Sequence, residues 1–138
     1  MGIYDLNLRV LVPYLPVLNW GAVRTLEISV LAILLSFPLG LVGALMRVAD
    51  NRLARAIATA YVETVRNIPL LVVLYILFLV LPLYGIRINS LTAGVLGLAI
   101  NSTAYTIEIV RSGFAAIPPG QYEAARSIGL HPLRSLGS

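Results

Sequence analysis

Two acid and arginine pairs are the residues of this chain best placed to do chemistry. Glu63 and Arg66 lie three residues apart, and so do Glu108 and Arg111. On a helix this spacing makes the two side chains neighbours, so each pair can form an ion pair. Each pair also borders an apolar run, where charges either neutralise each other at a membrane boundary or mark a water-filled path. The residues alone leave both interpretations open.

A second group of polar side chains falls inside the last apolar run. Asn101, Ser102, Thr103 and Tyr105 come shortly before Glu108. Hydrocarbon offers no hydrogen-bond partner, so such side chains face other helices or a water-filled path. They therefore either line a translocation path or bond this segment to further helices.

Other kinds of site are excluded by composition. The chain has no cysteine, so neither a disulfide framework nor a thiolate metal site can form, and its single histidine, His131, cannot make a metal site by itself. Its spaced glycines lie inside apolar runs, where no phosphate-binding loop can form. All ten basic residues are arginines scattered beside apolar runs, which is unlike a nucleic-acid face. We therefore expect no enzyme, no metal and no nucleic-acid partner.

The elements that position these residues are membrane helices. Hydrophobic residues make up 59% of the 138 and charged residues 12%, against about 25% charged in soluble proteins. Uncharged runs extend over residues 28–46, 68–84 and 88–107, and a helix needs about 20 residues to cross a bilayer. We predict an all-α integral membrane protein. After a lead-in over residues 1–19, its three spans are expected at about 22–46, 60–84 and 88–110.

Arginine placement predicts the orientation. One side would hold seven arginines: Arg47, Arg52, Arg55, Arg66, Arg111, Arg126 and Arg134. The other side would hold Arg9, Arg24 and Arg87. Because arginine-rich short loops stay in the cytoplasm, we expect the N-terminus outside and the C-terminal tail in the cytoplasm.

Two segments have features beyond hydrophobicity. Pro38, Gly40 and Gly43 in the first run are ordinary in membrane helices, but the glycines also let another helix approach closely. Residues 51–67 show the period of an amphipathic helix, with an apolar stripe of Leu53, Ile57, Tyr61 and Val65. This helix is expected along the interface or against a partner helix, and it meets Pro69, where a first turn or a kink is expected.

The segment after the last run predicts a short cytoplasmic helix over about residues 120–129. Pro118 and Pro119 end the preceding helix, Gly129 is a left-handed cap and Pro132 a stop. A helix of two turns is marginal in water, so we expect it to dock onto another protein or onto the membrane surface.

Four stretches in order resemble the polar amino-acid permeases, membrane subunits of bacterial ABC importers. "EAARSIG" is similar to their EAA loop, and "AYTIEIVRSGFAAIPPGQ" to the segment before it. "YVETVRNIPLLVVLYILFLVLP" resembles their second-span signature and "TLEISVLAILLSFPLGLVGALMR" their first span. The resemblance covers about residues 17–138.

The resemblance implies the membrane domain of a type I importer with a coupling helix. By carry-over the coupling residues are Glu123, Ala124, Ala125 and Gly129. The family-signature residues, which also have a possible pathway role, are Glu63, Arg66, Pro69, Asn101, Tyr105, Glu108 and Arg111. The implied partners are a cytoplasmic ATPase dimer, a second permease subunit, identical or not, a periplasmic amino-acid-binding protein and membrane lipid. ATP would bind the ATPase, so no cofactor is expected here.

The resemblance also implies a multi-pass protein of the bacterial inner membrane that translocates a polar amino acid. Members of the family continue with I-x-L-P and two more spans. We therefore expect this chain to be truncated before the last two spans and not to support uptake alone. The alternative is a transport-inactive or regulatory membrane protein derived from such a permease.

Overall fold

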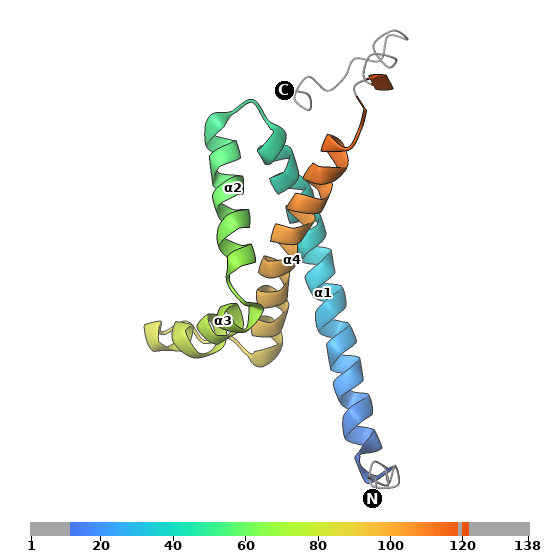
Figure 1. The fold of residues 1–138 in the computed structure, drawn as a ribbon. Helices are drawn as coiled ribbons and strands as arrows, with labels where there is room; N and C mark the ends of the chain where they lie inside the picture. The colour runs from blue at the N-terminus through green and yellow to red at the C-terminus, as the bar shows by residue number, and fades with distance from the viewer. Residues whose placement is uncertain (1–11, 119, 122–138) are drawn as a thin grey trace, which may run out of the picture.

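The computed structural model describes residues 12–118 and 120–121, and every regular element in them is helical (Figure 1). The elements in order are α1 (Leu15–Val48), α2 (Arg52–Asn67), α3 (Leu70–Tyr75), the π-helical η2 (Ile76–Val80), the 3-10 helix η3 (Leu81–Tyr84) and α4 (Ser90–Ala115). This confirms the predicted all-α fold.

The two long helices α1 and α4 are each apolar and long enough to cross a membrane. Helix α1 continues through Pro38 without a break. The two helices lie side by side over the C-terminal half of α1, whereas the N-terminal part of α1 extends away from the other helices (Figure 1). Large apolar side chains such as Leu34 and Phe37 stay exposed on α1, as expected for a surface that faces lipid.

Small residues form the contact between α1 and α4. The buried positions of α1 are Ala32, Ser36, Gly40, Gly43 and Ala44. A Cβ atom placed on Gly40 would lie 2.5 Å from Cβ of Thr106. Without hydrophobic driving force between helices in lipid, close backbone approach and van der Waals packing hold the pair together. The expected close-packing role of Gly40 and Gly43 is therefore confirmed.

Helix α2 packs against both long helices. Its start is capped by Asn51, whose side-chain oxygen accepts hydrogen bonds from the backbone N–H groups of Leu53 at 2.9 Å and Ala54 at 3.3 Å. The buried residues of α2 are Ala58, Val62 and Val65. Of the predicted apolar stripe, Val65 is buried against the other helices, whereas Leu53 and Ile57 are 68% and 54% exposed. In a membrane large apolar side chains can face lipid, and small ones allow close helix packing.

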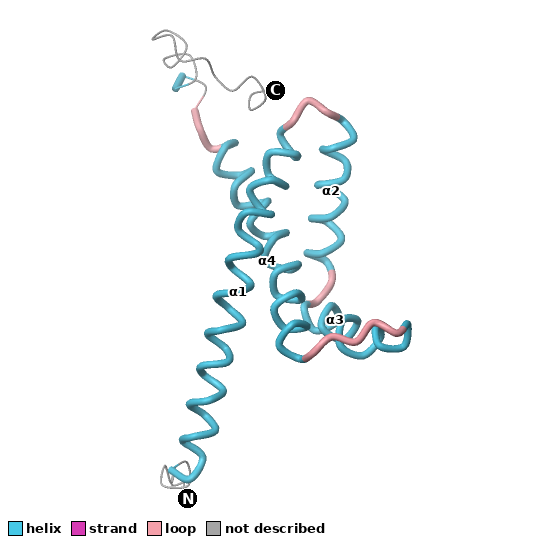
Figure 2. The backbone as a smooth tube through the Cα atoms, turned by 180° about the vertical axis from the view of Figure 1, so that it is seen from behind, coloured by secondary structure: helices cyan, strands magenta, loops and turns pink. Residues whose placement is uncertain are grey.

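The second expected span is broken. The helix ends at Asn67 and restarts after Pro69, and the segment of α3, η2 and η3 is bent by 97° from α2. Figure 2 shows this segment branching away from the bundle formed by the other helices. Leu74 of this segment packs closely against α4, since a Cβ added to Gly97 would lie 2.5 Å from Cδ2 of Leu74. Proline has no backbone N–H to donate, so the helical hydrogen bonds are interrupted at Pro69 and the break occurs there.

Four arginines lie at one end of the bundle. The end of α1, the start of α2 and the end of α4 lie together, and residues 120–121 follow α4 beyond this end (Figures 1 and 2). Arg47, Arg52, Arg55 and Arg111 are therefore at the same end. Arg66 is not, since it lies near the opposite end of α2, about 21 Å from Arg52 at 1.5 Å per residue.

Candidate functional site

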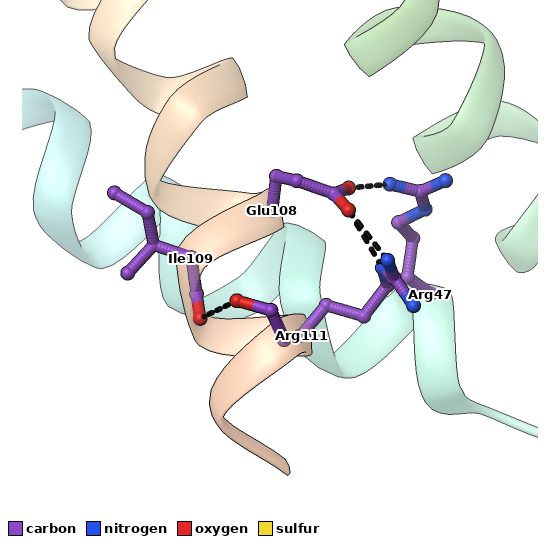
Figure 3. A network of polar contacts seen from close by, with 5 residues as sticks. Arg47, Glu108, Ile109 and Arg111 are labelled. Atoms are coloured by element: carbon purple, nitrogen blue, oxygen red, sulfur yellow. Dashed lines mark hydrogen bonds and ion pairs between the residues drawn. The ribbon is translucent and has the colours of Figure 1, made fainter. Parts of the chain in front are cut away.

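Glu108 of α4 is the centre of a charge cluster (Figure 3). Its Oε1 atom accepts hydrogen bonds from Nε of Arg111 at 3.1 Å and from Nη2 of the same residue at 2.5 Å. Its Oε2 atom accepts a hydrogen bond from Nη1 of Arg47 on α1. Both carboxylate oxygens are therefore occupied, and Glu108 and Arg111 form the ion pair that their spacing allows.

The cluster joins α1 to α4 at the arginine-rich end. The side chains of Arg47 and Glu108 are only 15% and 24% exposed, so little water screens their attraction. Removing one partner of such a pair leaves an uncompensated charge in a partly buried place. Sequence reasoning missed Arg47, which is 61 residues away from Glu108. The available signal was that each of these two residues directly follows the uncharged run of its helix.

Glu63 and Arg66 do not form the pair that their spacing allows. Among the described residues the ion pairs are Arg24 with Glu27 and Glu108 with its two arginines. The guanidinium carbon of Arg66 lies instead 5.4 Å from the ring centroid of Tyr105 on α4, a cation–π contact. Two family-signature residues thereby meet across α2 and α4, and the carboxylate of Glu63 is left exposed.

Polar side chains of α2 and α4 form hydrogen bonds to helix backbone. The buried hydroxyl of Thr103 donates to the carbonyl oxygen of Ala99 at 2.7 Å. The hydroxyl of Tyr61 on α2 donates to the carbonyl oxygen of Ile100 at 2.7 Å. The bond of Tyr61 joins α2 to α4 and fits the helix-bonding interpretation, whereas the bond of Thr103 stays within α4. Asn101, also a signature residue, is half-buried on α4.

The outward face of α2 forms an open groove. It is lined by Arg52, Arg55, Ala56, Thr59, Ala60 and Glu63. The floor is made of small residues, with positive charge near the start of the helix and negative charge toward its other end. Pro69 stands directly before α3 and fixes where α2 stops. The coupling residues Glu123, Ala124, Ala125 and Gly129 lie outside the described residues.

Apolar helices of membrane length, joined by charged side chains at one end, define a multi-pass integral membrane protein. The sequence model described as "Binding-protein-dependent transport system inner membrane component" matches residues 20–137. The chain belongs to this family, whose members are membrane components, and this places it in the inner membrane.

Known relatives show which group of proteins within this family the chain resembles. Over 109 residues the chain is 40% identical to the probable glutamine ABC transporter permease protein GlnM of Bacillus subtilis, covering 79% of this chain and 50% of GlnM. It is 35% identical over 127 residues to the probable amino-acid ABC transporter permease protein YckA of the same organism, covering 92% of this chain and 56% of YckA. These relatives confirm the resemblance to amino-acid permeases of ABC transporters.

A solved structure shares the fold. It is titled "Crystal structure of an amino acid ABC transporter with histidines", and it matches with a TM-score of 0.85 and 38% identity over 99% of this chain and 62% of that chain. The chain spans about half the length of the curated relatives it matches.

Proposed function

We propose that this chain acts in a permease subunit of an ATP-driven importer, which carries a polar amino acid across the bacterial inner membrane. The observation that supports this most strongly is the 40% identity to a probable glutamine permease, together with the fold shared with a solved amino-acid ABC transporter.

The orientation proposed is N-terminus outside and C-terminal tail in the cytoplasm. It is supported by the gathering of Arg47, Arg52, Arg55 and Arg111 at one end of the bundle, because arginines near span ends favour the cytoplasmic side. Residues 120–121 lie beyond that same end, so the segment 120–129 would emerge where ATP is.

The partners follow from this orientation. Glu123, Ala124, Ala125 and Gly129 would dock onto a cytoplasmic ATPase dimer, which binds the ATP, so this subunit needs no cofactor. A second permease subunit, identical or different, would complete the membrane domain. A periplasmic binding protein would deliver the amino acid from the other side.

Uptake tests the proposed function. The segment is expressed in the context of a full-length permease with two further spans, together with an ATPase and a binding protein, and accumulation of labelled polar amino acids is measured in cells. We expect accumulation of at least one amino acid, abolished by Gly129→Asp and retained in Gly113→Asp, since Gly113 has open space around it. Equal accumulation in both variants would contradict the coupling role, and no accumulation by the native protein would contradict the transport role.

Cysteine labelling tests the orientation, because the chain contains no cysteine of its own. Asp50→Cys lies in the turn between α1 and α2, and Tyr84→Cys replaces a side chain that is 80% exposed at the end of η3. A membrane-impermeant maleimide added to spheroplasts should label Tyr84→Cys at once and Asp50→Cys only after lysis. The reverse pattern would invert the proposed orientation.

A further inference from the structure

Close packing of α1 against α4 ends at Gly43 and Ile107, where an added Cβ on the glycine would overlap the isoleucine side chain. Farther along α4, a Cβ added to Gly113 would meet no atom within 4 Å, and Ile109 is 68% exposed. Helix α4 nevertheless continues to Ala115. About its last two turns therefore extend past the close packing with α1.

The charge cluster of Glu108 joins these last turns to α1 (Figure 3). Arg111 donates hydrogen bonds to the carboxylate from the same helix, and Nη1 of Arg47 donates one from α1. Arg47 lies in the last turn of α1, which ends at Val48 directly before the turn to α2. Among the ion pairs of the described residues, Arg47 with Glu108 is the one that links two helices. The end of α4 is thereby tied to the turn between α1 and α2.

The type of contact suits a role in positioning. Taking two charges out of water offsets much of their attraction, so a partly buried ion pair adds little stability compared with apolar residues in its place. Its geometry is nevertheless specific, because the planar fork of an arginine donates to a carboxylate in few orientations. Apolar packing has no such directional requirement. The cluster therefore fixes where the end of α4 lies relative to α1.

We propose that Arg47 is a positioning residue, through which a displacement of the end of α4 reaches α1 and α2. This inference rests on the proposed function, in which the segment after α4 docks onto an ATPase. Residues 120–121 follow α4 directly beyond its end (Figure 1), so movement of the ATPase acts first on the last turns of α4. Arg47 passes this movement to α1 and, through the adjoining turn, to α2.

The amount of amino acid transported per ATP hydrolysed tests this role. It is measured in proteoliposomes that contain a full-length permease with this segment, an ATPase and a binding protein. Arg47→Gln should lower the ratio at least about fivefold while ATP hydrolysis continues, because the end of α4 then moves without α1. Glu108 keeps Arg111 as its partner in this variant, so no carboxylate is left unpaired.

Two further variants separate positioning from stability. Arg47→Lys keeps the charge and should recover part of the ratio. Arg24→Gln breaks an ion pair within α1 and should leave the ratio at the native value. A merely structural role of Arg47 would lower the thermal midpoint of the complex in Arg47→Gln and leave the ratio unchanged.

A disulfide bond between α1 and α4 can replace the contact of Arg47. The chain contains no cysteine of its own, and a Cβ on Gly43 would lie 4.0 Å from Cβ of Ile107, within the range of about 3.5–4.5 Å found in disulfides. Oxidised Gly43→Cys with Ile107→Cys should transport with the native ratio. Adding Arg47→Gln to the oxidised pair should no longer lower the ratio, and reduction with dithiothreitol should bring the defect back.

Failure of the proposed function can be told apart from failure of this inference. No transport by the native complex would contradict the proposed function, and this inference with it. Native transport with an unchanged ratio in Arg47→Gln would overturn the positioning role alone. A defect of Arg47→Gln that persists in the oxidised pair would overturn it too, and so would loss of transport on oxidation when Arg47 is present, because α1 and α4 would then have to move apart.

Discussion

Substituting Gly40 by alanine should separate α1 from α4. The new Cβ atom would lie 2.4 Å from Cγ2 and 2.5 Å from Cβ of Thr106. Thr106 is β-branched and its Cβ is fixed to the helix backbone, so rotation of the side chain cannot remove both contacts. Overpacking of this kind costs about 1–3 kcal/mol.

Whether alanine raises or lowers the free energy of unfolding distinguishes this close contact from ordinary helix propensity. Alanine at an open glycine position in a helix gains about 0.5–1 kcal/mol, and Gly21 in α1 has no atom within 4 Å of an added Cβ. Gly21→Ala should therefore be neutral or stabilising and Gly40→Ala destabilising. Gly43→Ala should fall between them, because its nearest contact is Cδ1 at the flexible end of Ile107.

The assay is the thermal midpoint of the native complex in detergent, measured by the loss of the monodisperse peak in size-exclusion chromatography. A second substitution, Thr106→Gly, removes the obstructing side chain, so Gly40→Ala should lower the midpoint much less in the Thr106→Gly background than in the native protein. A Gly40→Ala midpoint equal to or above that of Gly21→Ala would refute the close approach at this position, and additive effects in the double variant would refute Thr106 as its cause.

Three further outcomes follow from individual contacts. Glu108→Gln should destabilise the complex by several kcal/mol because two arginines lose a partly buried partner. Glu27→Gln is the control, because it removes an exposed ion pair worth about 0–1 kcal/mol. Equal thermal midpoints of the two variants would refute the greater strength of the Glu108 cluster. Tyr61→Phe should cost about 0.5–1.5 kcal/mol through the lost hydrogen bond to Ile100, seen as a lower midpoint. Asn51→Ala should cost about 1 kcal/mol as a lost helix cap, with Asn51→Asp retaining the cap as the matched control.

The long helices could be predicted from the sequence because uncharged runs of about 20 residues are typical of helices that cross a membrane. The close contact at Gly40 and Gly43 was also indicated, since small residues one helical turn apart make an approachable face. Pro69 indicated a kink, but not its angle of 97°. In the bent segment Leu74 packs against Gly97, a contact between elements that no local pattern encodes.

The side of α2 that is buried could not be predicted by counting apolar residues. In water Leu53 and Ile57 would turn inward, because burying large apolar side chains drives folding. In lipid that force is absent and close packing decides, so Ala58 and Val62 turn inward.

Contacts within the bundle also determine which parts move together. Gly40 and Gly43 join α1 to α4 at Thr106 and Ile107, and Glu108 joins the two helices again in the same turn of α4. Tyr61 attaches α2 to the same helix. We therefore expect a displacement applied at the end of α4 to carry α1 and α2 with it. The break at Pro69 interrupts the helical hydrogen bonds between α2 and α3, so any bending within this part of the chain should be concentrated there, directly beyond Glu63 and Arg66.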